Sequence, residues 1–124
     1  MKHILLNCLL LLTLFSSCRH HNHNISISVK DREEDYQFSA TYHKSATAKV
    51  QYYINQHISP SHIFESVSDD IDASTELKDG TRFYIKSHPG YLKIKLDKES
   101  NSEAAYLRIK EMCNGIKTEL TTDR

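Results

Sequence analysis

Apolar and polar side chains alternate with a period of two in five short segments of this chain, which is typical of half-buried β-strands. In the second segment, for example, Tyr36, Phe38 and Ala40 share one face, and polar residues occupy the other. The predicted strands cover residues 25–29, 36–42, 71–77, 81–86 and 91–96. Asp79-Gly80 predicts a hairpin between the third and fourth strands, and His88-Pro89-Gly90 predicts a turn before the fifth.

Two longer segments place apolar residues at helical spacing. The first helix is predicted over residues 46–57, with Ser45 as its cap. Pro60 ends it, and Ser59-Pro60 is expected to begin one extra helical turn that includes Ile63, Phe64 and Val67.

The second helix is predicted to begin with a capping box formed by Ser100 and Glu103. Its apolar stripe consists of Ala105, Ile109, Met112 and Ile116. Gly115 lies near its end and predicts fraying from that point.

The resulting order of elements is ββα followed by βββα. One apolar face on each strand and one apolar stripe on each helix predict an α+β fold, a two-layer sandwich. It consists of an antiparallel sheet of about five strands with two helices on one face. We expect a single domain over residues 25–120, with residues 121–124 as a tail, because the chain of 124 residues is too short for two domains.

The first 17 residues have the pattern of a signal peptide. Lys2 provides a short basic start, and residues 4–15 are mostly apolar but too few to span a bilayer. The run Leu14-Phe15-Ser16-Ser17-Cys18 resembles the lipobox of bacterial lipoproteins, although Phe15 stands where that motif prefers Leu. The resemblance implies lipidation of the Cys18 sulfur, with acyl chains such as palmitate, and cleavage before Cys18. The alternative is an ordinary secretory peptide cleaved near Ser17.

Residues 18–24 then form the lipidated Cys and a polar tether. By resemblance to lipoprotein sorting rules, Arg19 argues against retention in the inner membrane, and the absence of an acidic run after Cys18 argues against surface export. We therefore expect a lipid-anchored protein of the cell membrane, in the outer membrane and facing the periplasm.

Charge and cysteine content narrow the function classes further. The formal net charge is zero, and removing Lys2 with the leader leaves 15 basic and 16 acidic side chains. This balance gives no reason to expect nucleic acid as a partner. Cys8 would be lost with the leader and Cys18 used for lipidation, so Cys113 has no partner for an internal disulfide.

Two clusters are candidate metal sites. His20, His21 and His23 could share a zinc, copper or nickel ion, but a solvated tether is the simpler interpretation. The segment from Asp70 is faintly similar to a calcium loop, but Thr75 and Thr81 replace the required Gly and Glu. An acidic loop before an edge strand is therefore the preferred interpretation there.

A catalytic thiol is a third hypothesis. Cys113 and His57 fall on the apolar stripes of the two helices, and a Cys–His pair can form a nucleophile. A free Cys is more often a small buried hydrophobe, and no oxyanion-hole motif accompanies this one. No Walker, dinucleotide-binding or nucleophile-elbow pattern occurs either.

The polar face of the sheet is the candidate binding face. If the apolar faces are assigned correctly, tyrosines and cations interleave there, and such residues suit a protein, a glycan or an anionic polymer. The candidate residues are Tyr84, Tyr91, Arg82, Lys93 and Lys95. The alternative is an ordinary solvated sheet face.

The run from Asp79 to Ser87, followed by Pro89-Gly90 and the run from Leu92 to Lys98, resembles small envelope lipoproteins of Bacteroidota, as does the His- and Asn-rich tether. That resemblance implies a source and no activity. The sequence thus predicts an envelope lipoprotein with a small binding or structural domain, no catalytic activity and no cofactor. Its expected partners are the membrane and an envelope protein or glycan. The alternatives are a periplasmic metal-binding protein that uses the tether histidines and a thiol hydrolase.

Overall fold

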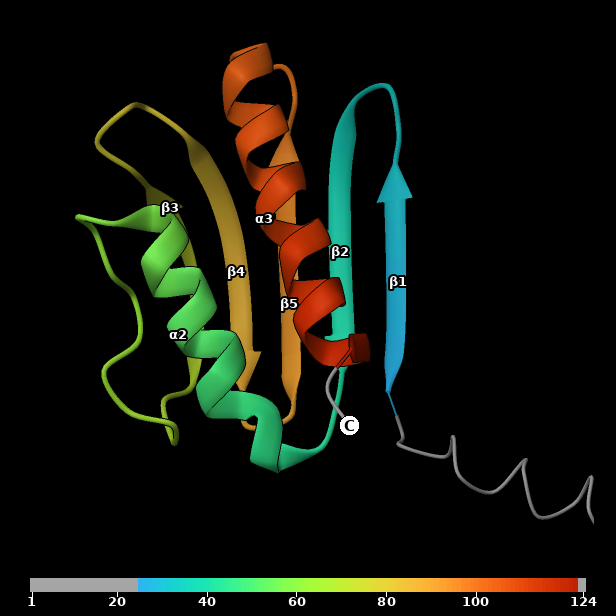
Figure 1. Cartoon of the computed structure of the whole chain (residues 1–124). Coiled ribbons are helices and arrows are strands. Elements are labelled where there is room, and N and C mark those ends of the chain that lie inside the picture. The colour runs from blue at the N-terminus through green and yellow to red at the C-terminus, as the bar shows by residue number, and fades with distance from the viewer. Residues whose placement is uncertain (1–24, 123–124) are drawn as a thin grey trace, which may run out of the picture.

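The computed structural model describes residues 25–122 as a five-stranded antiparallel sheet with two helices on one face (Figure 1). The elements in chain order are β1 (Ser26–Asp31), β2 (Asp35–Thr41), the 3₁₀ helix η2 (Lys44–Ala46), α2 (Thr47–Ile58), β3 (Ile71–Glu76), β4 (Arg82–His88), β5 (Tyr91–Asp97) and α3 (Glu103–Thr122). The strands lie in the order β1-β2-β5-β4-β3, so β1 and β3 form the edges. The predicted α+β sandwich and the order ββα-βββα are confirmed.

The period-two alternation sends the apolar residues of the three central strands toward the helices. Phe38 of β2 pairs with Ile94 of β5, and Ile94 also pairs with Ile85 of β4, so all three side chains lie in one row on the same face. All three are almost completely buried. Burying such side chains stabilises a fold by about 1.5–3 kcal/mol each relative to leaving them exposed.

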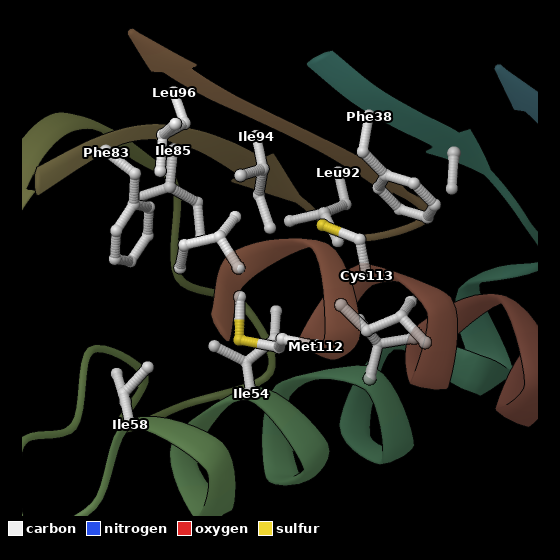
Figure 2. Close-up of a cluster of buried hydrophobic side chains, with 14 of the residues drawn as sticks. Phe38, Ile54, Ile58, Phe83, Ile85, Leu92, Ile94, Leu96, Met112 and Cys113 are labelled. Atoms are coloured by element: carbon white, nitrogen blue, oxygen red, sulfur yellow. The ribbon is translucent and has the colours of Figure 1, made fainter. Parts of the chain in front are cut away.

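The helices complete this core. Val50, Ile54 and Ile58 recur at intervals of four residues in α2, which places them on one stripe, and all are buried. In α3 the corresponding stripe includes Met112 and Cys113 (Figure 2). Both helices rest on the inner face of the sheet and on each other, so within residues 25–122 the opposite face of the sheet carries no helix (Figure 1).

Two glycines with positive φ shape the loops of the sheet. Gly80, at φ +91°, lies in the loop between β3 and β4, which Leu77 N–H closes by donating to Thr81 O at 2.8 Å. Gly90, at φ +85°, follows Pro89 in the turn between β4 and β5. A Cβ at Gly90 would lie 2.9 Å from Tyr42 O, so only glycine suits this position.

The segment between α2 and β3 contradicts the predicted extra helical turn. Residues 59–70 form turns, bends and irregular backbone, and Ser59-Pro60 is a cis peptide. Asn55 organises part of this segment: its Oδ1 accepts from Ile63 N–H at 2.9 Å, and its Nδ2 donates to Phe64 O at the same distance. The buried Phe64 side chain therefore anchors a loop. The apolar spacing of Ile63, Phe64 and Val67 does not correspond to a helix.

The predicted helix starts also need correction. Ser45 lies inside η2, and its N–H donates to His43 Nδ1, so it does not cap α2. At α3 the capping side chain is Ser102, whose Oγ accepts from Ala105 N–H at 3.1 Å. Ser100 is two residues too early, and its Oγ donates instead to Asp97 O.

The end of α3 differs from the prediction as well. The helix continues through Gly115 to Thr122, which includes the first two residues of the expected tail. The hydroxyl and ring of Tyr53 occupy the space that a Cβ at residue 115 would need. Gly115 is thus a point of close contact between α2 and α3, and the fraying predicted from it is wrong.

The end of edge strand β1 is tied to α3 by a polar cluster. Asp31 accepts from Tyr106 Oη at 2.5 Å and forms ion pairs with Lys98 at 2.9 Å and Lys110 at 3.1 Å. The Tyr106 hydrogen bond, followed by the one from Lys98, lowers the pKa of Asp31 to about 2. Most residues of β1 are exposed, so little of this strand is held by burial. The polar cluster provides a further connection between β1 and the helical layer.

Candidate functional site: the open face of the sheet

The open face of the sheet is the side opposite the helices. The same alternation that buries Phe38, Ile85 and Ile94 directs their polar neighbours outward on β2, β4 and β5. The outward residues of these strands include Gln37, Ser39, Tyr84, Lys86, Tyr91, Lys93 and Lys95. The predicted assignment of the two faces is therefore correct.

Three lysines gather at the centre of this open face. Lys86 of β4 pairs directly with Lys93 of β5, and Lys95 lies two residues farther along β5 on the same face. None of the three forms an ion pair within residues 25–122. Like charges in opposed cross-strand positions destabilise a sheet, so the fold tolerates here a local concentration of positive charge.

Tyr84 lies beside this lysine cluster. Its register partner on β5 is Lys95, whose Nζ is 5.8 Å from the centroid of the Tyr84 ring. Its hydroxyl donates to Asp72 Oδ1 on β3 at 2.7 Å, and this hydrogen bond raises the pKa of Tyr84. The bond holds the ring in place across β3 and β4, and it ends on the carboxylate of Asp72, the register partner of Lys86.

Tyr91 lies at the other end of the open face. It pairs with His88 of β4 across the turn, and the two rings stack with centroids 5.0 Å apart and planes at 16°. The site therefore has aromatic rings on both sides of the lysines.

An open hollow of about 590 Å³ adjoins the lysine cluster at the far end of the strands from Tyr91. Tyr84, Lys95 and Arg82 contribute to its lining. The hollow also has three carboxylates, those of Asp35, Glu76 and Asp97. Its volume is within the range of about 300–1,000 Å³ that is usual for small-molecule sites.

These carboxylates differ in their partners. Asp35 accepts from Arg32 at 2.8 Å and from Gln37 at 3.2 Å, and these contacts lower its pKa. Glu76 lies 3.4 Å from Arg82 in an exposed ion pair. The Asp97 side chain has no hydrogen-bond or ion-pair partner in the described part of the chain and faces Asp35 across β5 and β2. The hollow thus presents acceptor groups, next to a surface that presents cations.

The structure brings together most of the predicted binding residues. Tyr84, Lys93 and Lys95 lie next to one another, Arg82 lines the hollow, and Tyr91 lies beyond the lysines. Sequence reasoning missed Asp35, Asp97 and His88 as members of the face. The sequence pattern could have identified two of them, because His88 and Asp97 each lie two residues beyond the last outward residue assigned to β4 and β5.

The proposed Cys113–His57 pair is not formed. Cys113 is completely buried on the sheet-facing side of α3 (Figure 2), and burial raises the pKa of its thiol to about 12. The hydroxyl of Tyr36 interacts with this thiol and has no conventional hydrogen-bond partner within residues 25–122. His57 is exposed and stacks on Tyr53 with ring centroids 4.1 Å apart.

The candidate metal sites have different outcomes. The segment similar to a calcium loop is mostly edge strand β3, and within residues 25–122 no three His, Cys, Asp or Glu side chains are grouped to hold a metal ion. His20, His21 and His23 lie outside the described residues, as does the lipidation candidate Cys18. Neither helix of the described region is both long and apolar enough to cross a bilayer.

Comparison of this chain with protein-family models, with curated proteins and with solved structures finds no match.

Proposed function

We propose that this chain is a membrane-tethered lipoprotein of the cell envelope, anchored through Cys18, whose domain is a non-catalytic binding module. The observation that carries the proposal is the open face of the sheet, where Lys86, Lys93 and Lys95 cluster and form no ion pair within residues 25–122. A purely structural domain would gain stability from pairing these charges or from spacing them apart. Lysines without ion-pair partners are suited to a surface that binds a negatively charged ligand.

Two further observations support the non-catalytic part of the proposal. The thiol of Cys113 is buried and its pKa is raised, so the thiolate required of a nucleophile is disfavoured. His57, the base that a thiol enzyme would need, is directed to solvent on α2 and is stacked on Tyr53.

Site-specific photo-cross-linking in living cells tests the binding surface. The full chain would carry a photoreactive residue at Ser39, on the open face, or at Leu107, an exposed position on α3. We expect irradiation to attach a discrete envelope component at residue 39 and not at residue 107. Cross-linking from residue 107 alone would overturn the proposal, because the helical layer would then be the binding surface.

Membrane fractionation tests the anchor independently. The full chain should partition with membranes and incorporate labelled palmitate, and Cys18→Ala should abolish both. A wild-type chain that is unacylated and found free of membranes would contradict the lipoprotein assignment without affecting the result at Ser39.

A further inference from the structure

We propose that the ligand of the open face is an anionic saccharide, a sugar carrying a phosphate or carboxylate group. This inference rests on the proposed function and specifies its ligand. The juxtaposition that carries it is a cation cluster, formed by Lys86, Lys93 and Lys95, directly beside a hollow with carboxylates and a tyrosine ring.

The cation cluster accounts for the anionic group. Lys86 and Lys93 face each other across the strand pair, and Lys95 is the next outward residue on β5. A phosphate or carboxylate placed over them would accept charge-assisted hydrogen bonds and relieve the mutual repulsion of the lysines. This relief is absent when the site is empty, so it favours the bound state.

The hollow accounts for the sugar. Carboxylates that are ionised are hydrogen-bond acceptors only, and the hydroxyls of a sugar are donors. The Asp97 carboxylate is unpartnered in the described region, and Asp35 and Glu76 line the same hollow. The Tyr84 ring adds a face of negative potential against which the C–H bonds of a sugar ring can pack. A volume of about 590 Å³ leaves room for a ligand of this kind.

Charge distribution argues against nucleic acid as the ligand. A nucleic-acid strand carries a phosphate at every nucleotide and is held by extended basic surfaces. Here the three lysines lie at the centre of the face, and the adjoining hollow contains Asp35, Glu76 and Asp97 together with Arg82. A continuous polyanion that runs from the lysines through the hollow would be repelled by these carboxylates, whereas a ligand with a single anionic group places no second negative charge there.

Composition argues against a protein partner. The buried centres of protein–protein interfaces are enriched in apolar and aromatic residues and depleted of lysine. The outward residues at the centre of β2, β4 and β5 include one aromatic ring, that of Tyr84, no aliphatic side chain and three lysines. A hydrated polar ligand suits this surface better than the apolar core of a protein interface.

Titration of the full chain in a sugar-free detergent tests the proposal. The probes are glucose 6-phosphate, glucuronate, glucose, inorganic phosphate, single-stranded DNA and an acidic peptide, with binding followed by calorimetry and by shifts of the Tyr84 and Lys95 amide resonances. We expect glucose 6-phosphate or glucuronate to bind more tightly than either glucose or phosphate alone. Raising the salt concentration should weaken that binding.

Variants locate the binding. Lys93→Gln should weaken binding of the anionic sugar by about tenfold, because each charge-assisted hydrogen bond contributes on that order. Asp97→Asn should weaken binding of the sugar and leave the affinity for inorganic phosphate unchanged or raised. Lys117→Gln, which removes the same charge from an exposed position on α3, should change neither affinity.

Three outcomes would overturn the inference. These are tighter binding of DNA or the acidic peptide than of any sugar, equal affinity for glucose and its phosphate, and anionic-sugar binding that survives Lys93→Gln. Each would leave the cross-linking result at Ser39 intact, so the binding module would stand with a different ligand. Failure of cross-linking at Ser39 would instead remove the proposed function itself.

Discussion

Lys93 on β5 lies directly opposite Lys86 on β4, and neither side chain forms an ion pair within residues 25–122. Removing one charge should relieve their repulsion, so we expect Lys93→Gln to raise the free energy of unfolding by about 0.2–1 kcal/mol. Chemical denaturation of the full chain measures this, and the gain should shrink at high salt. Lys117→Gln is the matched control with no expected gain. A destabilised Lys93→Gln protein would show that the lysine contributes more by packing than it costs by repulsion.

Gly115 supplies a second prediction. Alanine is intrinsically favoured over glycine inside a helix by about 1 kcal/mol, so Gly115→Ala would be stabilising on propensity alone. The Tyr53 hydroxyl occupies the space of the new methyl group, and we expect a net loss of about 1–2 kcal/mol instead. Asn114→Ala, at an exposed neighbouring position, should be neutral or stabilising. The loss should largely disappear in a Tyr53→Ala background, and an additive double mutant would contradict the contact.

Asp31 supplies a prediction of pH dependence. Its pKa is lowered from 3.8 to about 2 in the folded protein, first by the hydrogen bond from Tyr106 and then by that from Lys98. A lowered pKa contributes stability above the unfolded value, and this contribution is lost as the pH falls from about 4 through 2. Asp31→Asn should therefore cost about 1 kcal/mol or less at neutral pH, because solvent screens these partly exposed pairs. Equilibrium unfolding across that pH range should show the difference from wild type vanish in acid, and a constant difference would contradict the assignment.

Cys113 should behave as an inert core residue. With its pKa raised to about 12, the thiol is protonated at neutral pH, and it is completely buried. We expect thiol reagents to label it slowly in the folded protein and quickly in denaturant, as read by mass spectrometry of the peptide that contains it. Cys113→Ala should cost about 1 kcal/mol of stability through lost packing. Rapid labelling that slows in His57→Ala would restore the thiol-enzyme hypothesis.

The strands could be predicted because their signal is local. Alternation of Phe38 with its polar neighbours, or of Ile94 with Lys93 and Lys95, reports which face is buried without knowledge of the partner strand. The observed ends differ from the predicted ones by at most two residues. Polar members at strand ends such as Asp97 were missed because alternation was followed only between apolar residues.

The errors arose where a distant residue decides the local structure. Ile63 and Phe64 have an apolar spacing that suits a helix, but the Asn55 side chain binds their backbone and fixes a loop. Gly115 normally weakens a helix, but here it allows the helices to approach at Tyr53. The order of the strands, the hollow and the Asp31 cluster likewise depend on pairings between distant segments, which one sequence does not specify.

The position of β1 at the edge of the sheet has a mechanical consequence. Within residues 25–122, β1 begins at Ser26 and is bonded along one side only, to β2. Tension transmitted through the preceding residues would first load the pairing of Ser26 with Thr41, and would reach Asp31 last. Under such tension, β1 would separate from β2 before β4 separates from β5. A ligand bound to the lysines of β4 and β5 would therefore remain bound while the β1–β2 pairing breaks.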